Sequence, residues 1–107
     1  MVRNVVNDEI RDTTWKESSV SLANDNIHGM FHIVNKLDES VRVQIYGSSG
    51  GSDKLEHDVR LANLSVEPDY GEAVSFRNPW NKIKIRYKAG VAPTSGNLLI
   101  TGMYGDT

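Results

Sequence analysis

The chain contains no cysteine, three prolines among 107 residues, and an aromatic content of 7%. Without cysteine it cannot form a disulfide, a thiolate nucleophile, or a cysteine-ligated zinc or iron–sulfur site. Small secreted domains commonly depend on disulfides, so this absence favours a reducing compartment or a virus particle. The length fits one domain with one hydrophobic core.

Strong net charge and long apolar runs are also missing. Twelve Lys and Arg residues against fourteen Asp and Glu residues leave a formal charge of −2. This balance predicts no nucleic-acid partner and no anionic membrane surface as a partner. The first residues lack the apolar run of about 7–15 residues that a signal peptide needs. No segment approaches the roughly 18 apolar residues of a transmembrane helix. We therefore expect neither a signal peptide nor a transmembrane helix.

Helical periodicity is scarce, whereas alternation of apolar and polar residues is common. Residues 41–46 and 83–88 alternate as half-buried strands do. Residues 30–34 are denser in apolar side chains, and we interpret them as a strand buried on both faces. Further strands are expected at 20–22, 59–66, 74–76 and 98–104. The expected core consists of Phe31, Ile33, Val43, Ile45, Phe76, Ile83, Ile85 and Ile100.

Turn residues separate these runs, and all three prolines fall between strands. Residues 35–40 form a link of hairpin length between two of the strands. Six or seven short strands with turns between them predict an all-β fold, an antiparallel β-sandwich of jelly-roll or Ig-like topology. A small Sm-like or OB-like barrel is the alternative.

The first 15 residues are mostly polar, with isolated apolar anchors at Val5, Val6, Ile10 and Trp15. We interpret residues 1–15 as an N-terminal arm or an edge strand, and residues 16–107 as a single β-sandwich domain. Apolar anchors this sparse are typical of segments that a symmetric oligomer buries between copies. The hypothesis is that the segment docks on a neighbouring copy, and the alternative is an edge strand of its own sandwich.

Three patterns resemble catalytic or metal sites but lack their context. Residues 47–51 match G-x-S-x-G, yet no helix is expected after them, so a flexible loop tip is favoured over a nucleophile. His28 and His32 would be about 13 Å apart on a strand, too far for one zinc ion. The sequence Glu56-His57-Asp58 is interpreted as a solvated loop edge. We therefore predict no catalytic residue, no metal, no cofactor and no enzyme activity.

Exposed aromatic and basic residues suggest surfaces for binding. Tyr70 lies in a turn and is the best candidate for an exposed sugar-binding platform, and Trp80 is expected to cover one end of the core. Tyr87 continues an inward-facing series, whereas Tyr46 is expected on the outer face. Basic side chains at 82, 84, 86 and 88 share one face of a strand, which either meets an acidic partner or protects an edge strand from pairing.

Residues 35–48, 79–89 and 92–100 together resemble small β-sandwich structural proteins of phages and viruses. Such families carry no catalytic residues, and the resemblance implies a structural protein that assembles as symmetric copies on a particle. It implies a minor virion component, such as a capsid decoration, head or tail module. Its partners would then be itself and other virion proteins, and it would be found in the virion or in the host cytoplasm during assembly.

These considerations predict a non-enzymatic homo-oligomeric virion component. A carbohydrate-binding β-sandwich module is the alternative, with carbohydrate as the partner. The candidate interface residues are Val5, Ile10, Trp15, Tyr70 and Trp80.

Overall fold

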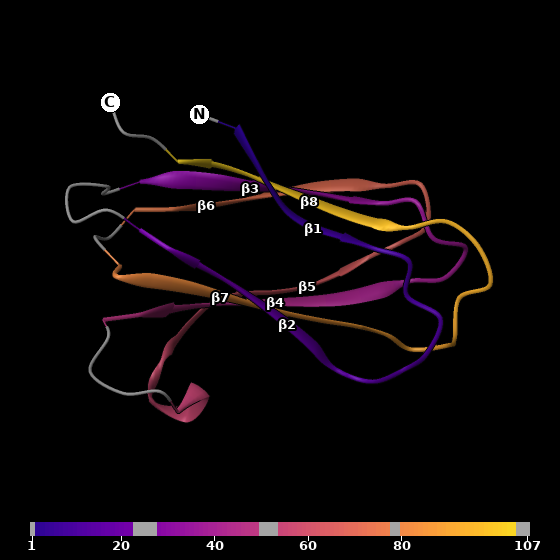
Figure 1. The fold of residues 1–107 in the computed structure, drawn as a ribbon, viewed down its shortest axis with the longest axis horizontal. Coiled ribbons are helices and arrows are strands. Elements are labelled where there is room, and N and C mark those ends of the chain that lie inside the picture. Colours follow the sequence, from indigo (N-terminus) through magenta and orange to yellow (C-terminus); the bar gives the residue numbers. More distant parts are fainter. Residues whose placement is uncertain (1, 23–27, 50–53, 78–79, 105–107) are drawn as a thin grey trace.

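Two antiparallel four-stranded sheets pack face to face in the computed structural model, which describes residues 2–22, 28–49, 54–77 and 80–104 (Figure 1). The upper sheet in the figure has the order β1-β8-β3-β6, and the lower sheet has the order β2-β7-β4-β5. The upper strands are β1 Val2–Asp8, β3 Gly29–Asn35, β6 Gly71–Phe76 and β8 Leu98–Tyr104. The lower strands are β2 Lys16–Ser21, β4 Val41–Ser48, β5 Val59–Val66 and β7 Lys82–Ala89.

This strand order is that of a jelly roll, which confirms the all-β sandwich and selects between the two topologies expected. β4 and β5 are the one pair of consecutive strands hydrogen-bonded to each other in the described chain. The interpretation of residues 35–40 as a hairpin link is therefore wrong. β3 and β4 belong to different sheets, so this segment is a corner that crosses between them.

The core lies between the sheets. It consists of the inward-facing residues of the strands, which alternate with outward-facing residues along each strand. All eight predicted core residues are buried, with at most 4% of any side chain exposed. The rings of Phe31 and Phe76 lie 5.6 Å apart between centroids. Tyr87 is buried as predicted, and its hydroxyl donates to Asp8 across the two sheets at 3.0 Å. Burial, together with this carboxylate, raises the pKa of Tyr87 above its ordinary value of 10.0.

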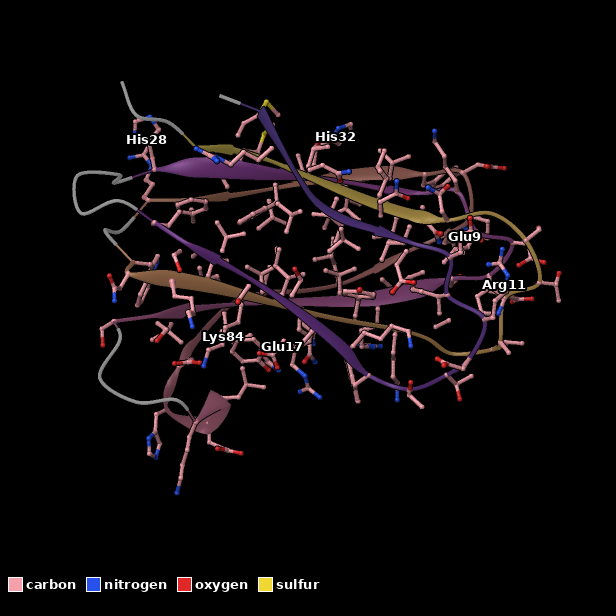
Figure 2. All side chains as sticks on the ribbon, in the orientation of Figure 1. Glu9, Arg11, Glu17, His28, His32 and Lys84 are labelled. Atoms are coloured by element: carbon pink, nitrogen blue, oxygen red, sulfur yellow. The ribbon has the colours of Figure 1, made fainter. Side chains whose placement is uncertain are left out.

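Strand β3 departs from its expected environment. Phe31 and Ile33 are fully buried, but His32 between them is exposed on the outside of the upper sheet (Figure 2). The strand is thus buried on one face, because nothing in the described chain covers the outer face at this point. The prediction that β3 is buried on both faces, which was based on its many apolar residues, is therefore wrong.

The first strand forms one edge of the upper sheet. β1 pairs with β8 over Val2 to Asp8, with an irregularity between Asn4 and Val6. Val6 is 5% exposed and Ile10 is 1% exposed, both within the core of their own chain. Within the single chain, Val2–Asp8 is an edge strand of the upper sheet, and residues 9–15 link it to β2.

Four links meet at one end of the sandwich, drawn at the right of Figure 1: β1–β2, β3–β4, β5–β6 and β7–β8. Gly96 in the last of these has φ of +86°, and a Cβ there would lie 1.8 Å from the Lys36 carbonyl oxygen. Only glycine allows the β7–β8 link to approach the β3–β4 corner this closely. This end of the molecule carries the candidate site.

Candidate functional site

The outer face of the β2-β7-β4-β5 sheet is rich in cations. Ile83, Ile85 and Tyr87 point into the core, and the residues between them therefore point outward, as the alternation of a strand requires. Lys84 is drawn on the outside of this lower sheet in Figure 2, near Glu17. Of the two roles considered for this basic series, an acidic partner or the protection of an edge strand, the second is wrong. β7 lies between β2 and β4 and its edges are already paired.

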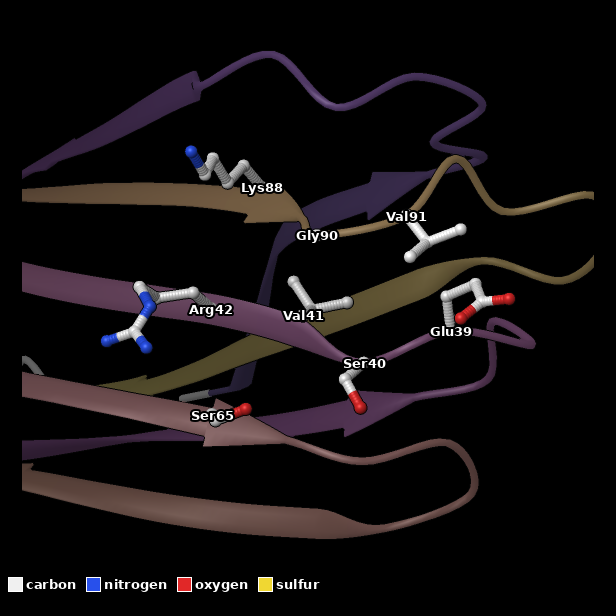
Figure 3. A pocket seen from close by; sticks show the side chains of 8 residues that line it. All are labelled: Glu39, Ser40, Val41, Arg42, Ser65, Lys88, Gly90 and Val91. Atoms are coloured by element: carbon white, nitrogen blue, oxygen red, sulfur yellow. The ribbon is translucent and has the colours of Figure 1, made fainter.

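Strand β4 places a second cation beside this series. Arg42 is the cross-strand partner of Lys88 on one side and of Ser65 on the other. An Arg42 N–H donates to Asn63 Oδ1 at 3.2 Å. No carboxylate among the described residues forms a salt bridge with Arg42 or Lys88. The two side chains extend in different directions, Arg42 to Asn63 and Lys88 to the Trp15 ring, as Figure 3 shows for the two cations.

A hollow of about 290 Å³ opens beside these two cations, where the sheet meets the link end (Figure 3). Ser40 and Ser65 contribute hydroxyl groups, and Val91, which is 60% exposed, contributes an apolar side chain. The Glu39 carboxylate is drawn beside Val91, away from the Arg42 and Lys88 side chains. The full lining is Glu39, Ser40, Val41, Arg42, Ser65, Lys88, Gly90 and Val91. The hollow is therefore cationic at one end and acidic at the other.

Trp15 holds part of the cationic series in place. The guanidinium carbon of Arg86 lies 4.3 Å from the centroid of the Trp15 ring, and Lys88 Nζ lies 5.1 Å from it. Both distances suit cation–π contacts. Trp15 was expected to anchor an interface with a neighbouring copy. In its own chain it packs against the cations of β7 and orients Lys88 near the hollow.

Lys84 takes no part in this surface charge. Its Nζ lies 2.8 Å from Asp58 Oδ2, and the side chains are 9% and 3% exposed. Asp58 follows the 3₁₀ turn Leu55–His57, which brings the carboxylate back over the sheet. The interpretation of residues 56–58 as a solvated edge is therefore wrong for Asp58, because its carboxylate is buried against Lys84 of β7.

The corner beside the hollow is fixed by a contact between two links. Thr94 donates to Asp38 twice, through its backbone N–H at 2.9 Å to Oδ1 and through its hydroxyl to Oδ2. These hydrogen bonds, chiefly the one from the hydroxyl, lower the pKa of Asp38 below its ordinary value of 3.8. Asp38 and Thr94 thus join the segments that supply Glu39 and Val91 to the hollow.

We expect Asp38→Asn to weaken the domain at neutral pH and to lose this effect in acid. Because the pKa of Asp38 is lower in the folded than in the unfolded chain, its ionised form stabilises the fold above about pH 4. The contribution disappears as the pH falls through the folded-state pKa and the carboxylate is protonated. Urea unfolding of both proteins at pH 7 and pH 2.5 measures this. An equal difference between them at both pH values would contradict it.

The other predicted interface residues have different environments. Val5 is partly buried against the core, and Ile10 is buried within it, so Ile10 offers no surface to a partner. Trp80 is partly buried, packs against the core as expected, and covers Gly47, where a Cβ would meet its ring at 2.4 Å. Tyr70 is 62% exposed at the start of β6. The structure does not bring these residues together in one surface.

The remaining motifs do not assemble into a reactive site. Gly47 and Ser48 belong to β4, so the G-x-S-x-G segment starts inside a strand, and residues 50–53 lie outside the described chain. His28 is exposed before β3, and His32 is exposed on it. Within the described ranges no three His, Cys, Asp or Glu residues gather as a metal site would require. The same ranges contain no helix with the length and hydrophobicity that crossing a bilayer requires.

Arg42 and Ser65 were missed as site residues at the sequence level. The alternation in the sequence places Arg42 on an outer face. It does not show that Lys88 and Ser65 are the neighbours of Arg42. That neighbourhood depends on the pairing of β4 with both β7 and β5. The sequence contained one signal for this site, which is that Arg42 and Lys88 are outward-facing cations on two separate predicted strands.

No protein-family model and no curated protein sequence matches the chain. Solved structures share its fold at low identity. The PBSX exported protein XepA matches with a TM-score of 0.75 and 13% identity over 98% of this chain, which spans 37% of the length of that protein. The family 32 CBM of C. perfringens NanJ, solved with galactose, matches with a TM-score of 0.54 and 15% identity. The match covers 88% of this chain and 69% of the CBM chain.

A third similar structure is the enzymatically active domain of a tailspike protein of Bacteriophage CBA120. It matches with a TM-score of 0.54 and 9% identity over 98% of this chain and 19% of that one. At such identities the likeness shows the fold, a β-sandwich, and leaves the site to be argued from the residues of this chain.

Proposed function

We propose that this domain is a non-enzymatic virion module that binds carbohydrate through the outer face of the β2-β7-β4-β5 sheet. The observation that carries the proposal is the hollow beside Arg42 and Lys88. It combines charged groups, hydroxyl groups and one exposed apolar side chain, which suits a ligand with many hydroxyl groups and an apolar ring face. Carbohydrate-binding and phage proteins among the similar structures support the choice of ligand and setting.

The non-enzymatic part of the proposal is supported by the lining of the hollow. Its two serines, Ser40 and Ser65, have no histidine beside them in that lining. A serine nucleophile requires a neighbouring base to take its proton. A binding role needs only the hydrogen-bonding groups that the lining provides.

Two matched substitutions test the location of the site. Ser65 and Ser75 are exposed serines on the edge strands β5 and β6, but Ser65 alone lines the hollow. We expect Ser65→Trp to fill the hollow and abolish carbohydrate binding, and Ser75→Trp to leave it unchanged. Isothermal titration calorimetry with the glycans that an array identifies measures both. Equal affinity of the two variants would place the binding site elsewhere.

Self-assembly on a particle is the second candidate function. The observation that favours it is the edge strand β6, which leaves one side unpaired and exposes Glu72, Ala73 and Ser75, with the exposed Tyr70 just before it. Such an edge can pair with another chain. If β6 joins copies, light scattering gives a dimer or larger, and Ala73→Pro reduces it. A monomer at all concentrations contradicts self-assembly.

A further inference from the structure

We infer that the ligand of this face is an acidic polysaccharide, whose carboxylate or sulfate group binds between Arg42 and Lys88. This inference rests on the proposed carbohydrate-binding function and adds the chemical class of the ligand. It begins from the two cations, which are directly opposite one another on β4 and β7. Their side chains extend apart, Arg42 to Asn63 and Lys88 to the Trp15 ring, and an anion that enters the hollow between them is attracted by both.

The two cations are available for such an anion. Arg42 uses an N–H on the neutral amide oxygen of Asn63, which leaves further donors of its guanidinium for a ligand. Lys88 contacts the ring of Trp15 and forms no salt bridge with a carboxylate of the described residues. A guanidinium can bind a carboxylate or sulfate through two parallel hydrogen bonds, which favours Arg42 as the principal contact.

The other residues of the hollow determine how a sugar residue is oriented in it. Glu39 lies away from the cations, so it repels a second anion but accepts hydrogen bonds from sugar hydroxyl groups. Ser40 and Ser65 can either donate or accept. The acidic group of a sugar residue therefore lies toward Arg42 and Lys88, with its hydroxyl groups toward Glu39.

A nucleic acid fits this surface less well than an acidic sugar. The cationic series along β7 is interrupted, because Asp58 neutralises Lys84 and Glu17 is the cross-strand partner of Arg86. Binding of a regular phosphate chain depends on continuous positive charge, and the formal charge of the whole chain is −2. An acidic protein surface is also disfavoured, since protein interfaces centre on aromatic and apolar anchors and Val91 is the one exposed large apolar side chain in this lining.

A glycan array tests the inference with pairs of polymers that differ only in charge. Polygalacturonate, alginate and sialylated polymers are printed beside their carboxyl-reduced forms, heparin beside its desulfated form, and neutral polymers and an oligonucleotide complete the set. We expect binding to at least one acidic polymer and at least tenfold weaker binding to its uncharged counterpart, about the effect of one charge-assisted hydrogen bond.

Three single variants of the full chain are measured on the same array. Arg42→Gln and Lys88→Gln should each weaken binding about tenfold, whereas Lys82→Gln, an outward cation of β7 outside the hollow, should change it less than about twofold. The free Arg42→Gln protein should melt close to the temperature of the original, because residue 42 is exposed on the outer face and a glutamine amide can also donate a hydrogen bond to Asn63. At the same concentration, the acidic polymer should raise the melting temperature of the original protein more than that of the variant.

The possible failures are distinguishable. Binding to neutral polymers that Arg42→Gln leaves unchanged would overturn the acidic ligand and retain the carbohydrate-binding function. Absence of binding to every polysaccharide would overturn both, and so would stronger binding to the oligonucleotide than to any polysaccharide. Equal losses in the Lys82→Gln and Arg42→Gln proteins would show a diffuse charge effect, which also overturns a site between Arg42 and Lys88.

Discussion

A chain that begins at Lys16 is expected to be unfolded. Removing residues 1–15 takes away β1, leaves the edge of β8 unpaired, and removes Val6 and Ile10 from the core. Each of these buried side chains contributes roughly 1.5–3 kcal/mol by burial alone. Domains of this size are stable by about 5–15 kcal/mol, so losing both anchors together with a strand's hydrogen bonds removes most of that margin.

Circular dichroism and thermal melting of the shortened chain measure this effect. The full chain carrying Val6→Ala and Ile10→Ala separates packing from strand pairing, and should remain folded with a lower melting temperature. Glu9→Ala, at an exposed position between them, should melt like the original protein. A folded monomer that melts cooperatively near the original temperature would contradict the role of β1. It would instead agree with an arm that docks on a neighbouring copy.

Asn35→Leu is expected to destabilise the domain by about 3–6 kcal/mol, because it leaves three backbone groups near the core without partners. Asn35 is fully buried. Its amide donates to the carbonyl oxygens of Glu39 and Val66, both at 2.9 Å, and its Oδ1 accepts from the Leu37 N–H at 3.0 Å. The side chain thus ties the β3–β4 corner to the end of β5.

Urea unfolding at pH 7 measures the loss. Asn35→Asp is a near-isosteric second variant, which preserves the contact with Leu37 but turns an oxygen toward two carbonyl oxygens, and should be destabilised too. Asn97→Ala is the matched control. Asn97 donates to Asn7 at 2.7 Å on the surface, where water can replace the bond, so a loss under about 1 kcal/mol is expected. Equal losses for Asn35→Leu and Asn97→Ala would contradict the bridging role of Asn35.

The strands and their inward faces could be predicted from the sequence because alternation reports directly which side chains are buried. Val43 and Ile85 illustrate this, since both lie in period-2 runs and both are fully buried. The pairing of strands could not be predicted in this way. The outer lysines of β7 would alternate identically on an edge strand or a central one. Residues 35–40 likewise have the length of a hairpin, although the segment crosses between sheets.

The candidate site was less predictable than the core because it depends on contacts between distant segments. Lys88 was noted as an outward cation, but its neighbours Arg42 and Trp15 come from β4 and from the β1–β2 link. The burial of Asp58 depends on a turn that folds back over Lys84. The residue types alone indicated a basic face. The assembled sheet is needed to show which of these cations form no salt bridge with a carboxylate of the described residues.

The pairing of β1 with β8 also has a kinetic consequence. Residues 2–8 leave the ribosome well before their hydrogen-bonding partners at 98–103, which lie about 90–100 positions further along the chain. At typical rates of synthesis, the first strand waits on the order of 5–20 s for its partner. The sheet that contains both strands cannot close before β8 emerges. Contacts this distant in sequence place its folding in the millisecond to second range, slower than that of a helical bundle of the same size.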